Sequence, residues 1–145
     1  MKKSPLFIAS IIVASFLLAI LLTACEAEVT TASLSEATMC RSVDSDMRPI
    51  DTTDVFATDT PEIFCSVKLS YAPPETEVKA EWIYVQGELE GTEDYLIDDY
   101  SLSAEGTLYL SFSLTKPEAG WPTGEYKVIL YVDGNEKLSV PFTVQ

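Results

Sequence analysis

The sequence contains no histidine, so it lacks the side chain that most often serves as a general base near neutral pH and as a metal ligand. Catalysis by Ser-His-Asp or Cys-His arrangements is therefore excluded, as is every zinc site built on imidazole. Basic residues are scarce too: 9 Lys and Arg stand against 23 Asp and Glu, giving a formal net charge of −14 at pH 7. A chain of this charge repels phosphate backbones, so nucleic-acid binding is close to excluded.

Helical patterning is also missing from most of the chain. The 145 residues suffice for one ordinary domain, and beyond residue 39 no stretch shows a 3.6-residue apolar period over ten residues. The long apolar run lies at the N-terminus, where Lys2 and Lys3 precede an uncharged segment from Ser4 to Ala24. Such a segment is typical of a signal peptide or of an uncleaved membrane helix.

The end of this segment favours the signal peptide. Leu22-Thr23-Ala24-Cys25 places small residues just before a cysteine and a branched apolar residue three positions before it. This tetrapeptide resembles the lipobox of bacterial lipoproteins. The resemblance implies removal of residues 1–24, lipidation of Cys25, and a lipid anchor on the extracytoplasmic side of the cell membrane, where two acyl chains give durable binding. The alternative is an uncleaved helix with an incidental cysteine, and in both cases the rest of the chain is exported.

The residues after Cys25 predict a tether. Residues 26–39 consist of Ala, Ser, Thr, Glu and Val with a single leucine, a single methionine and no aromatic residue. Such a stretch cannot bury enough apolar area to offset the entropy lost on ordering it. We therefore expect a signal peptide over residues 1–24, a lipidated flexible tether over residues 25–39, and a folded domain over residues 40–145.

The folded domain shows the period-two alternation of β-strands. Asp133-Gly134 indicates a hairpin near the end of the chain, and Pro141 suits an edge strand. About seven short strands with one buried face each predict an all-β, antiparallel β-sandwich. The strong strands are expected over 63–69, 78–84, 108–114, 126–132 and 138–144, and weaker ones over 52–58 and 95–102.

The domain resembles an immunoglobulin-like sandwich. Cys65 in the second strand and Trp82 in the third occupy the places of the core cysteine and tryptophan, and Tyr126 resembles the tyrosine corner. The usual partner of the core cysteine is absent, because Val128 stands two positions after Tyr126. The turn Gly-Trp-Pro-Thr-Gly at 120–124 is similar to one in small uncharacterised prokaryotic lipoproteins, a likeness that brings no known activity.

Two cysteines remain once Cys25 is assigned to the lipid. Since exported proteins commonly pair their cysteines, we predict a disulfide between Cys40 and Cys65. Closing a loop of about 25 residues would stabilise the fold by about 3–4 kcal/mol in the chain-entropy model. The alternative is two buried free thiols, because Cys65 points inward in the strand alternation.

The candidate binding residues are four acids and one tryptophan. The acids Glu93, Asp94, Asp98 and Asp99 could hold Ca²⁺ through carboxylate oxygens, although solvated surface charge is the simpler interpretation. Trp121 would be a binding anchor if it were exposed. We expect it instead to fold back and close one end of the core.

A match to a catalytic motif is interpreted as chance. Ser113-Leu114-Thr115-Lys116 fits the Ser-x-x-Lys of penicillin-binding enzymes, but it ends a strand and the Ser-Asp-Asn and Lys-Thr-Gly elements are missing. We therefore expect no enzymatic activity and no cofactor. The expected function is a non-enzymatic protein-binding or assembly module of the cell envelope, with an envelope protein as partner. Two alternatives stay open: a Ca²⁺- or carbohydrate-binding module, and an inhibitor or chaperone-like subunit.

Overall fold

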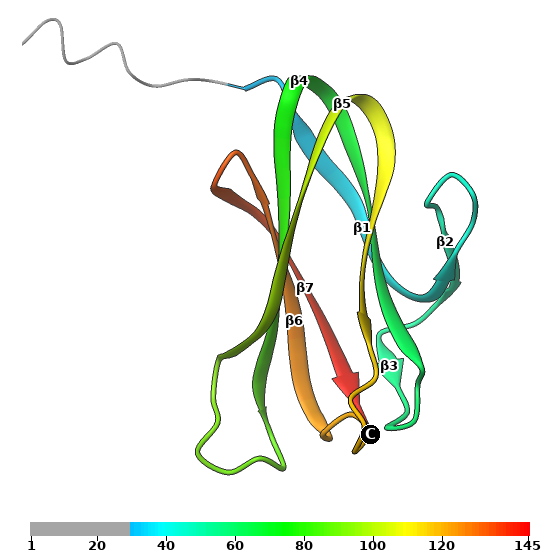
Figure 1. Ribbon diagram of the computed structural model, residues 1–145, viewed down its shortest axis with the longest axis vertical. Helices are drawn as coiled ribbons and strands as arrows, with labels where there is room; N and C mark the ends of the chain where they lie inside the picture. The colour runs from blue at the N-terminus through cyan, green and yellow to red at the C-terminus, as the bar shows by residue number, and fades with distance from the viewer. Residues whose placement is uncertain (1–29) are drawn as a thin grey trace, which may run out of the picture. The chain divides into compact units, whose positions relative to one another are not determined.

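The computed structural model describes residues 30–145, which form a domain of seven strands (Figure 1). The predicted signal peptide, Cys25 and the start of the predicted tether lie outside these residues. Within residues 30–145, no helix has the length and hydropathy needed to cross a bilayer. The strands are β1 (Ser33–Val43), β2 (Pro49–Thr52), β3 (Val55–Phe56), β4 (Glu62–Gly87), β5 (Tyr95–Thr115), β6 (Gly124–Val132) and β7 (Asn135–Val144).

Two strands are long enough to run through both layers of the sandwich. β4 and β5 pair antiparallel along both of their halves, with register shifts between Leu69 and Thr76 of β4, where Pro73 and Pro74 follow Ala72. The pair bends there, at the upper end of Figure 1. Predicted strands 63–69 and 78–84 are thus two halves of β4, joined through the bend.

The two layers differ in the strands that flank β4. In the first layer, the first half of β4 lies between β1, which also pairs with β2, and the second half of β5. In the second layer, the second half of β4 lies between the first half of β5 and β6, followed by β7 and β3. All pairs are antiparallel except β3 with β7. This is the predicted all-β, immunoglobulin-like sandwich.

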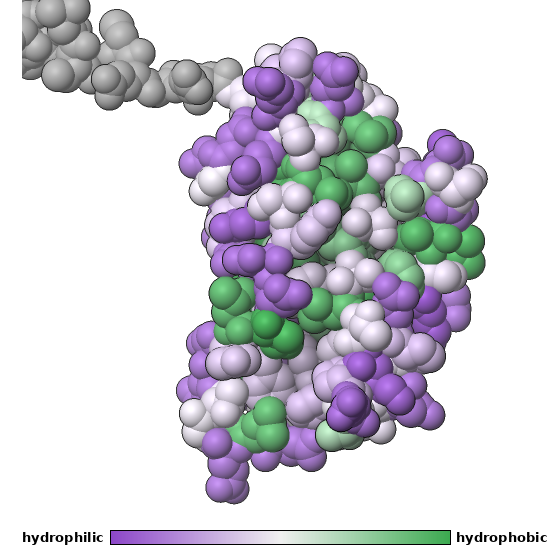
Figure 2. Space-filling view, in the orientation of Figure 1, coloured by the Kyte–Doolittle hydropathy of each residue, from purple (hydrophilic) through white to green (hydrophobic). Residues whose placement is uncertain are grey.

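The core is built from the alternating positions expected from the sequence. Val67 of the first layer and Trp82, Val128 and Leu130 of the second layer are at most 2% exposed. The second layer therefore buries its tryptophan as an immunoglobulin-like domain does. One side of the sandwich is less covered: Figure 2 shows apolar residues gathered on the face formed by β5.

The start of the domain differs from the prediction. β1 begins at Ser33 and pairs with β4 from Ser33–Ser70 to Cys40–Phe64, while Ala32 and Met39 are buried. The prediction of a tether up to residue 39, with a domain boundary at residue 40, is therefore wrong. Composition reports how much apolar area a segment can bury, but β1 also gains a ladder of backbone hydrogen bonds to β4, which small residues provide equally well.

The predicted disulfide is wrong as well, since Cys40 and Cys65 are free thiols. In the β1–β4 ladder Met39 pairs with Cys65, and Cys40 pairs with Phe64. Directly paired residues point to the same face and successive residues to opposite faces. The Cys65 side chain therefore faces the core and the Cys40 side chain faces the other way. Diverging Cβ vectors cannot be bridged without backbone movement, so the structure matches the alternative of two buried free thiols.

Candidate functional site

The loop between β5 and β6 closes one end of the core with Trp121. This side chain is 4% exposed, and its Nε1 donates a hydrogen bond to the carbonyl oxygen of Thr60 at 2.7 Å. Its ring packs edge-on against Tyr126, with 6.4 Å between centroids. The expectation that Trp121 folds back onto the core is confirmed, and it is not an exposed binding anchor.

A glycine and a tyrosine hold this loop in place. Gly124 has φ +148° and pairs with Gly87 of β4, and a Cβ on Gly124 would collide with the carbonyl oxygen of Gln86. Two residues later, the hydroxyl of Tyr126 donates to the carbonyl oxygen of Pro122 at 2.6 Å. This bond completes the tyrosine corner that the sequence predicted.

An apolar cavity of about 360 Å³ opens beside this loop. Its walls come from the end of β4, the loop after β4, the start of β5, the loop before β6 and the start of β6. Four of the side chains are aromatic, a composition typical of binding cavities. Its apolar lining includes Tyr84, Leu89, Tyr95, Ile97, Trp121 and Tyr126.

The aromatic walls of the cavity differ in exposure. Tyr84 and Tyr126 are 2% exposed, and the Tyr84 hydroxyl is held by the carbonyl oxygen of Thr123 at 3.1 Å. Tyr95, by contrast, is 59% exposed at the start of β5, and Leu89 is 44% exposed in the preceding loop. The cavity therefore has a fixed floor of core residues and a rim of accessible apolar side chains.

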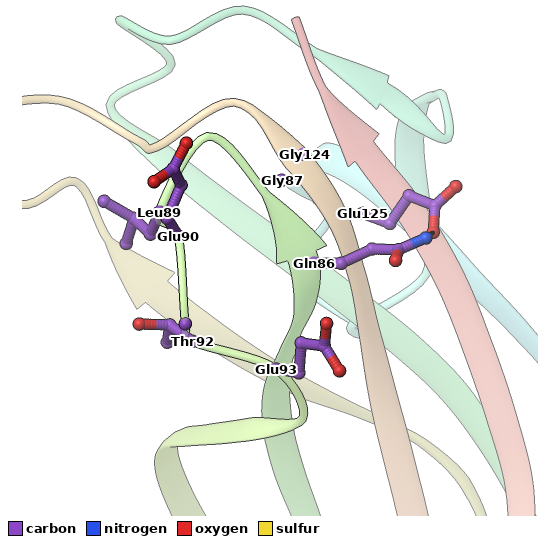
Figure 3. Close-up of a pocket in the computed structure, with 9 residues that line it drawn as sticks. Gln86, Gly87, Leu89, Glu90, Thr92, Glu93, Gly124 and Glu125 are labelled. Atoms are coloured by element: carbon purple, nitrogen blue, oxygen red, sulfur yellow. Dashed lines mark hydrogen bonds between the residues drawn. The ribbon is translucent and has the colours of Figure 1, made fainter.

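A polar hollow of about 510 Å³ adjoins the loop after β4 (Figure 3). Gln86 donates from Nε2 to Oε2 of Glu125 at 2.8 Å, and the carboxylates of Glu90 and Glu93 also line the hollow. Within residues 30–145, no three acidic or cysteine side chains lie close enough together to hold a metal ion. The hollow therefore adds negative charge beside the cavity without forming a cation site.

The four acids predicted as candidate Ca²⁺ ligands do not converge. Glu93 and Asp94 end the loop after β4, whereas Asp98 and Asp99 are successive residues of β5 and so point to opposite faces. One Asp98 oxygen accepts the backbone N–H of Asp99 at 2.8 Å, and all four acids are exposed. The Ca²⁺ site considered from the sequence is not formed, and these residues are solvated charge.

The serine of the Ser-x-x-Lys match has a partner within the sheet. Ser113 donates from Oγ to the carboxylate of Glu62 at 2.7 Å across the β4–β5 ladder. The backbone N–H of Lys116 donates to the carbonyl oxygen of Pro61 at 2.8 Å. The motif thus lies on an exposed strand end, where both residues serve the pairing of β5 with the start of β4.

The buried thiols are held in their protonated form. Burial raises the pKa of Cys65 to about 12, with a smaller contribution from the nearby Cys40 thiol. Burial also raises the pKa of Cys40 above its ordinary value. Because the thiolate is the nucleophilic form, neither side chain is activated for chemistry near neutral pH.

The strand pattern of the sequence does not predict the cavity. It places Tyr95 and Ile97 in a weak strand, and the preceding loop stands out only as a run of acids. A signal is present, because Tyr95-Leu96-Ile97 is an apolar run between the acidic pairs Glu93-Asp94 and Asp98-Asp99. Three adjacent apolar residues in an otherwise acidic stretch indicate a surface that another part of the chain or a partner contacts.

Comparison with known proteins identifies the fold alone. No protein-family model matches the chain, and no curated protein matches it. The chain is similar to part of the alkylpurine DNA glycosylase AlkC of Pseudomonas fluorescens, bound to DNA containing an abasic site analog (TM-score 0.51, 17% identity, 79% of this chain and 30% of that chain). It is also similar to part of a beta-glucosidase of Listeria innocua in complex with gluconolactone (TM-score 0.51, 8% identity, 79% of this chain and 16% of that chain).

A third similar structure is a small protein. An immunoglobulin-like protein of Pseudomonas aeruginosa matches with a TM-score of 0.49 and 14% identity, over 83% of this chain and 99% of that chain. The chain thus spans 30% and 16% of the two enzymes above and 99% of this protein. At these identities no activity is transferred from any of them.

Proposed function

We propose that this chain is an exported, lipid-anchored module of the cell envelope that binds another protein and catalyses no reaction. The cavity beside Trp121 carries the proposal, because it combines a fixed aromatic floor with exposed apolar side chains at its rim. Aromatic and apolar anchors surrounded by polar residues are the usual composition of protein-binding surfaces.

The position of the cavity in the domain supports this function. The chain enters the domain at the bend of β4 and β5, where Thr31 donates from Oγ1 to the carbonyl oxygen of Tyr71 at 2.8 Å. The loop after β4 and the loop that carries Trp121 lie at the other end of the sandwich (Figure 1). An anchor at Cys25 would therefore hold the domain by its bend and leave the cavity end accessible.

The charge of the protein supports the same arrangement. With a formal net charge of −14, the chain is repelled by anionic lipid headgroups. The domain would therefore stand away from the bilayer surface instead of lying against it. Binding of carbohydrate by stacking on Trp121 is disfavoured, because that ring is 4% exposed.

Site-specific crosslinking in intact cells tests this function. A photoreactive phenylalanine analogue is placed at position 95, at the cavity rim, and in a matched variant at position 71, at the bend. Both tyrosines are exposed, by 59% and 76% respectively. We expect position 95 to capture an envelope protein and position 71 not to capture it. Equal capture from both positions, or none from position 95, contradicts the proposal.

The anchor is tested separately. We expect wild-type protein to incorporate labelled palmitate and to sediment with the membrane fraction, and we expect Cys25→Ser to lose the label. Incorporation by Cys25→Ser equal to that of the parent would refute the lipidation. A mature protein that still carries residues 1–24 in mass spectrometry would do the same.

A further inference from the structure

Strand β5 leaves one side of the sandwich without a covering strand. It pairs with β4 along both halves, and within residues 30–145 no other strand pairs with it. The first half of β5 is thus the edge of the second layer, and its second half is the edge of the first layer. An open edge of 21 residues presents a long row of backbone donors and acceptors to another chain.

The inner face of this edge is only partly covered. Tyr100 pairs in register with the core residue Ala80, so its side chain projects from the face that covers the core. It is nevertheless 62% exposed, and Leu108 of the other half of β5 is 39% exposed. Of the ten exposed large hydrophobic residues described, five lie on β5. Figure 2 shows this apolar surface between the two halves of β5.

This surface continues into the cavity. Tyr95 and Ile97 belong to the first half of β5 and also line the cavity beside Trp121. We define the β5 slot as this cavity together with the apolar side chains of Tyr95, Ile97, Tyr100 and Leu108. The slot combines an unpaired edge, an apolar face and a place for one large side chain.

We propose that the β5 slot accepts an extended, basic segment of the partner protein, which adds a strand to the first half of β5. The inference rests on the proposed function and names the chemistry of the partner. In strand addition, main-chain hydrogen bonds supply affinity and alternate side chains supply specificity. The segment would place an apolar or aromatic side chain in the cavity and Lys or Arg beside the acids.

The charge around the slot identifies the segment as basic. From Ala80 to Thr115 the sequence contains eight Asp and Glu and no Lys or Arg. Asp98 pairs in register with the core residue Trp82 and Asp99 with Glu81, so the first carboxylate lies on the inner side of the edge strand and the second on the outer side. Opposite charges across neighbouring strands are stabilising, and like charges are destabilising. A lysine of the segment opposite Asp99 would therefore favour binding, while the apolar side chains of the segment face the slot.

The same charges argue against a second copy of this chain as the occupant. Two β5 edges paired with each other would bring Asp98 and Asp99 of one copy close to those of the other. An inward-facing carboxylate on an edge strand is a common means of preventing such self-pairing. The slot therefore favours a basic segment over the acidic β5 edge of a second copy.

Peptide binding to the purified full chain in detergent micelles tests the inference. The probe is a fluorescein-labelled nonapeptide of alternating Val and Lys with a central Phe. One control peptide carries N-methyl groups on alternate amides, which keeps the charge but prevents strand pairing, and another has Glu in place of Lys. Fluorescence anisotropy should show binding of the probe, with both controls weaker by about tenfold or more.

Variants of the protein locate the binding. Ile97→Ser and Tyr100→Ser remove apolar contacts without changing the charge, at residues that are 38% and 62% exposed, so the fold should persist, which circular dichroism verifies. Each should weaken binding of the probe by about tenfold, whereas Tyr71→Ser at the bend should have no effect. Equal affinity for the N-methylated peptide, or unchanged affinity in both slot variants, would show non-specific attraction to an acidic protein and overturn the inference.

The outcomes also separate this inference from the function on which it rests. Capture of an envelope protein from position 95, together with no preference for the alternating basic peptide, leaves the proposed function and rejects the strand addition. No capture from position 95 rejects the function itself. A dimer in sedimentation that Tyr100→Ser dissociates would identify a second copy as the occupant and reject the basic segment.

Discussion

The hydroxyl of Tyr126 lies 2.6 Å from the carbonyl oxygen of Pro122, to which it donates a hydrogen bond. The Tyr126 ring also packs edge-on against Tyr84 and stacks on Phe142, with 5.0 Å between centroids in both pairs. Burial raises the pKa of Tyr126, so its hydroxyl remains a donor at neutral pH. This one side chain ties the loop that carries Trp121 to the core, and the shape of the cavity depends on it.

We expect Tyr126→Phe to lower the free energy of unfolding by about 0.5–1.5 kcal/mol, because the part-buried hydrogen bond to the carbonyl oxygen of Pro122 is lost. The measurement is denaturant-induced unfolding of mutant and parent. Tyr95→Phe, at a side chain that is 59% exposed, is the matched control and should leave the stability unchanged. Equal stability of both variants would show that the tyrosine corner contributes nothing.

Gly124→Ala should destabilise the domain through a collision with the carbonyl oxygen of Gln86. Gly91 is the control, because it also has a positive φ but a Cβ there would meet nothing within 4 Å. Gly91→Ala therefore reports the free-energy cost of a Cβ on backbone with a positive φ, without any collision. We expect Gly124→Ala to cost about 1–3 kcal/mol more than Gly91→Ala in the same unfolding experiment. Equal costs would mean that β4 and β6 can move apart freely at this point.

Thiol titration distinguishes the free cysteines from a disulfide. In a Cys25→Ser protein kept without reductant, an aromatic disulfide reagent at pH 8 should react with no thiol in the native state, because Cys40 and Cys65 are both buried. In denaturant it should react with two. Finding none under denaturing conditions would establish the pairing that the structure lacks.

The stability of the domain should fall as the pH rises above about 9. The folded state raises the pKa of Cys65 from 9.0 to about 12. Between these values the unfolded chain has lost the proton that the folded chain retains, so each pH unit costs up to about 1.4 kcal/mol. Tyr126, whose pKa is also raised, acts in the same direction above its ordinary value of 10.0.

The denaturant midpoint measured at pH 8, 9 and 10 checks this dependence. Cys65→Ala removes the thiol and should flatten the decline between pH 9 and 10, although its stability at pH 8 will be lower because of the lost packing. The comparison therefore uses the slope and not the absolute midpoint. An unchanged slope in Cys65→Ala would assign the decline to other groups.

Much of the sandwich could be predicted because each of its strands has one buried face. Alternation fixed the direction of Trp82 and Cys65 from local sequence, and both are buried. The orientation of Cys40 depends on the register of β1 against β4, which no local pattern contains. The error about the tether has a similar origin, since the hydrogen bonds of residues 33–39 come from a strand some 30 residues later.

The candidate site was predicted only where one segment determines it. The turn around Trp121 contains the glycines and the proline that fold it back, so its closure of the core could be inferred. The cavity could not, because its walls come from the end of β4, the starts of β5 and β6, and two loops. The acids near it were recognised as a group, but only the fold shows that Glu90 and Glu93 line a separate polar hollow beside the apolar cavity.

The placement of the chain entry and the cavity at opposite ends of the sandwich has a mechanical consequence. If the chain is anchored before Thr31 and binds a partner at the cavity end, as proposed, the partner would pull roughly along the strands. The hydrogen bonds between β1 and β4 would then share the load simultaneously, as in shear, instead of breaking one after another as a zipper does. In that arrangement the β1–β4 hydrogen bonds would resist tension between membrane and partner, although the domain has no covalent crosslink among its described residues.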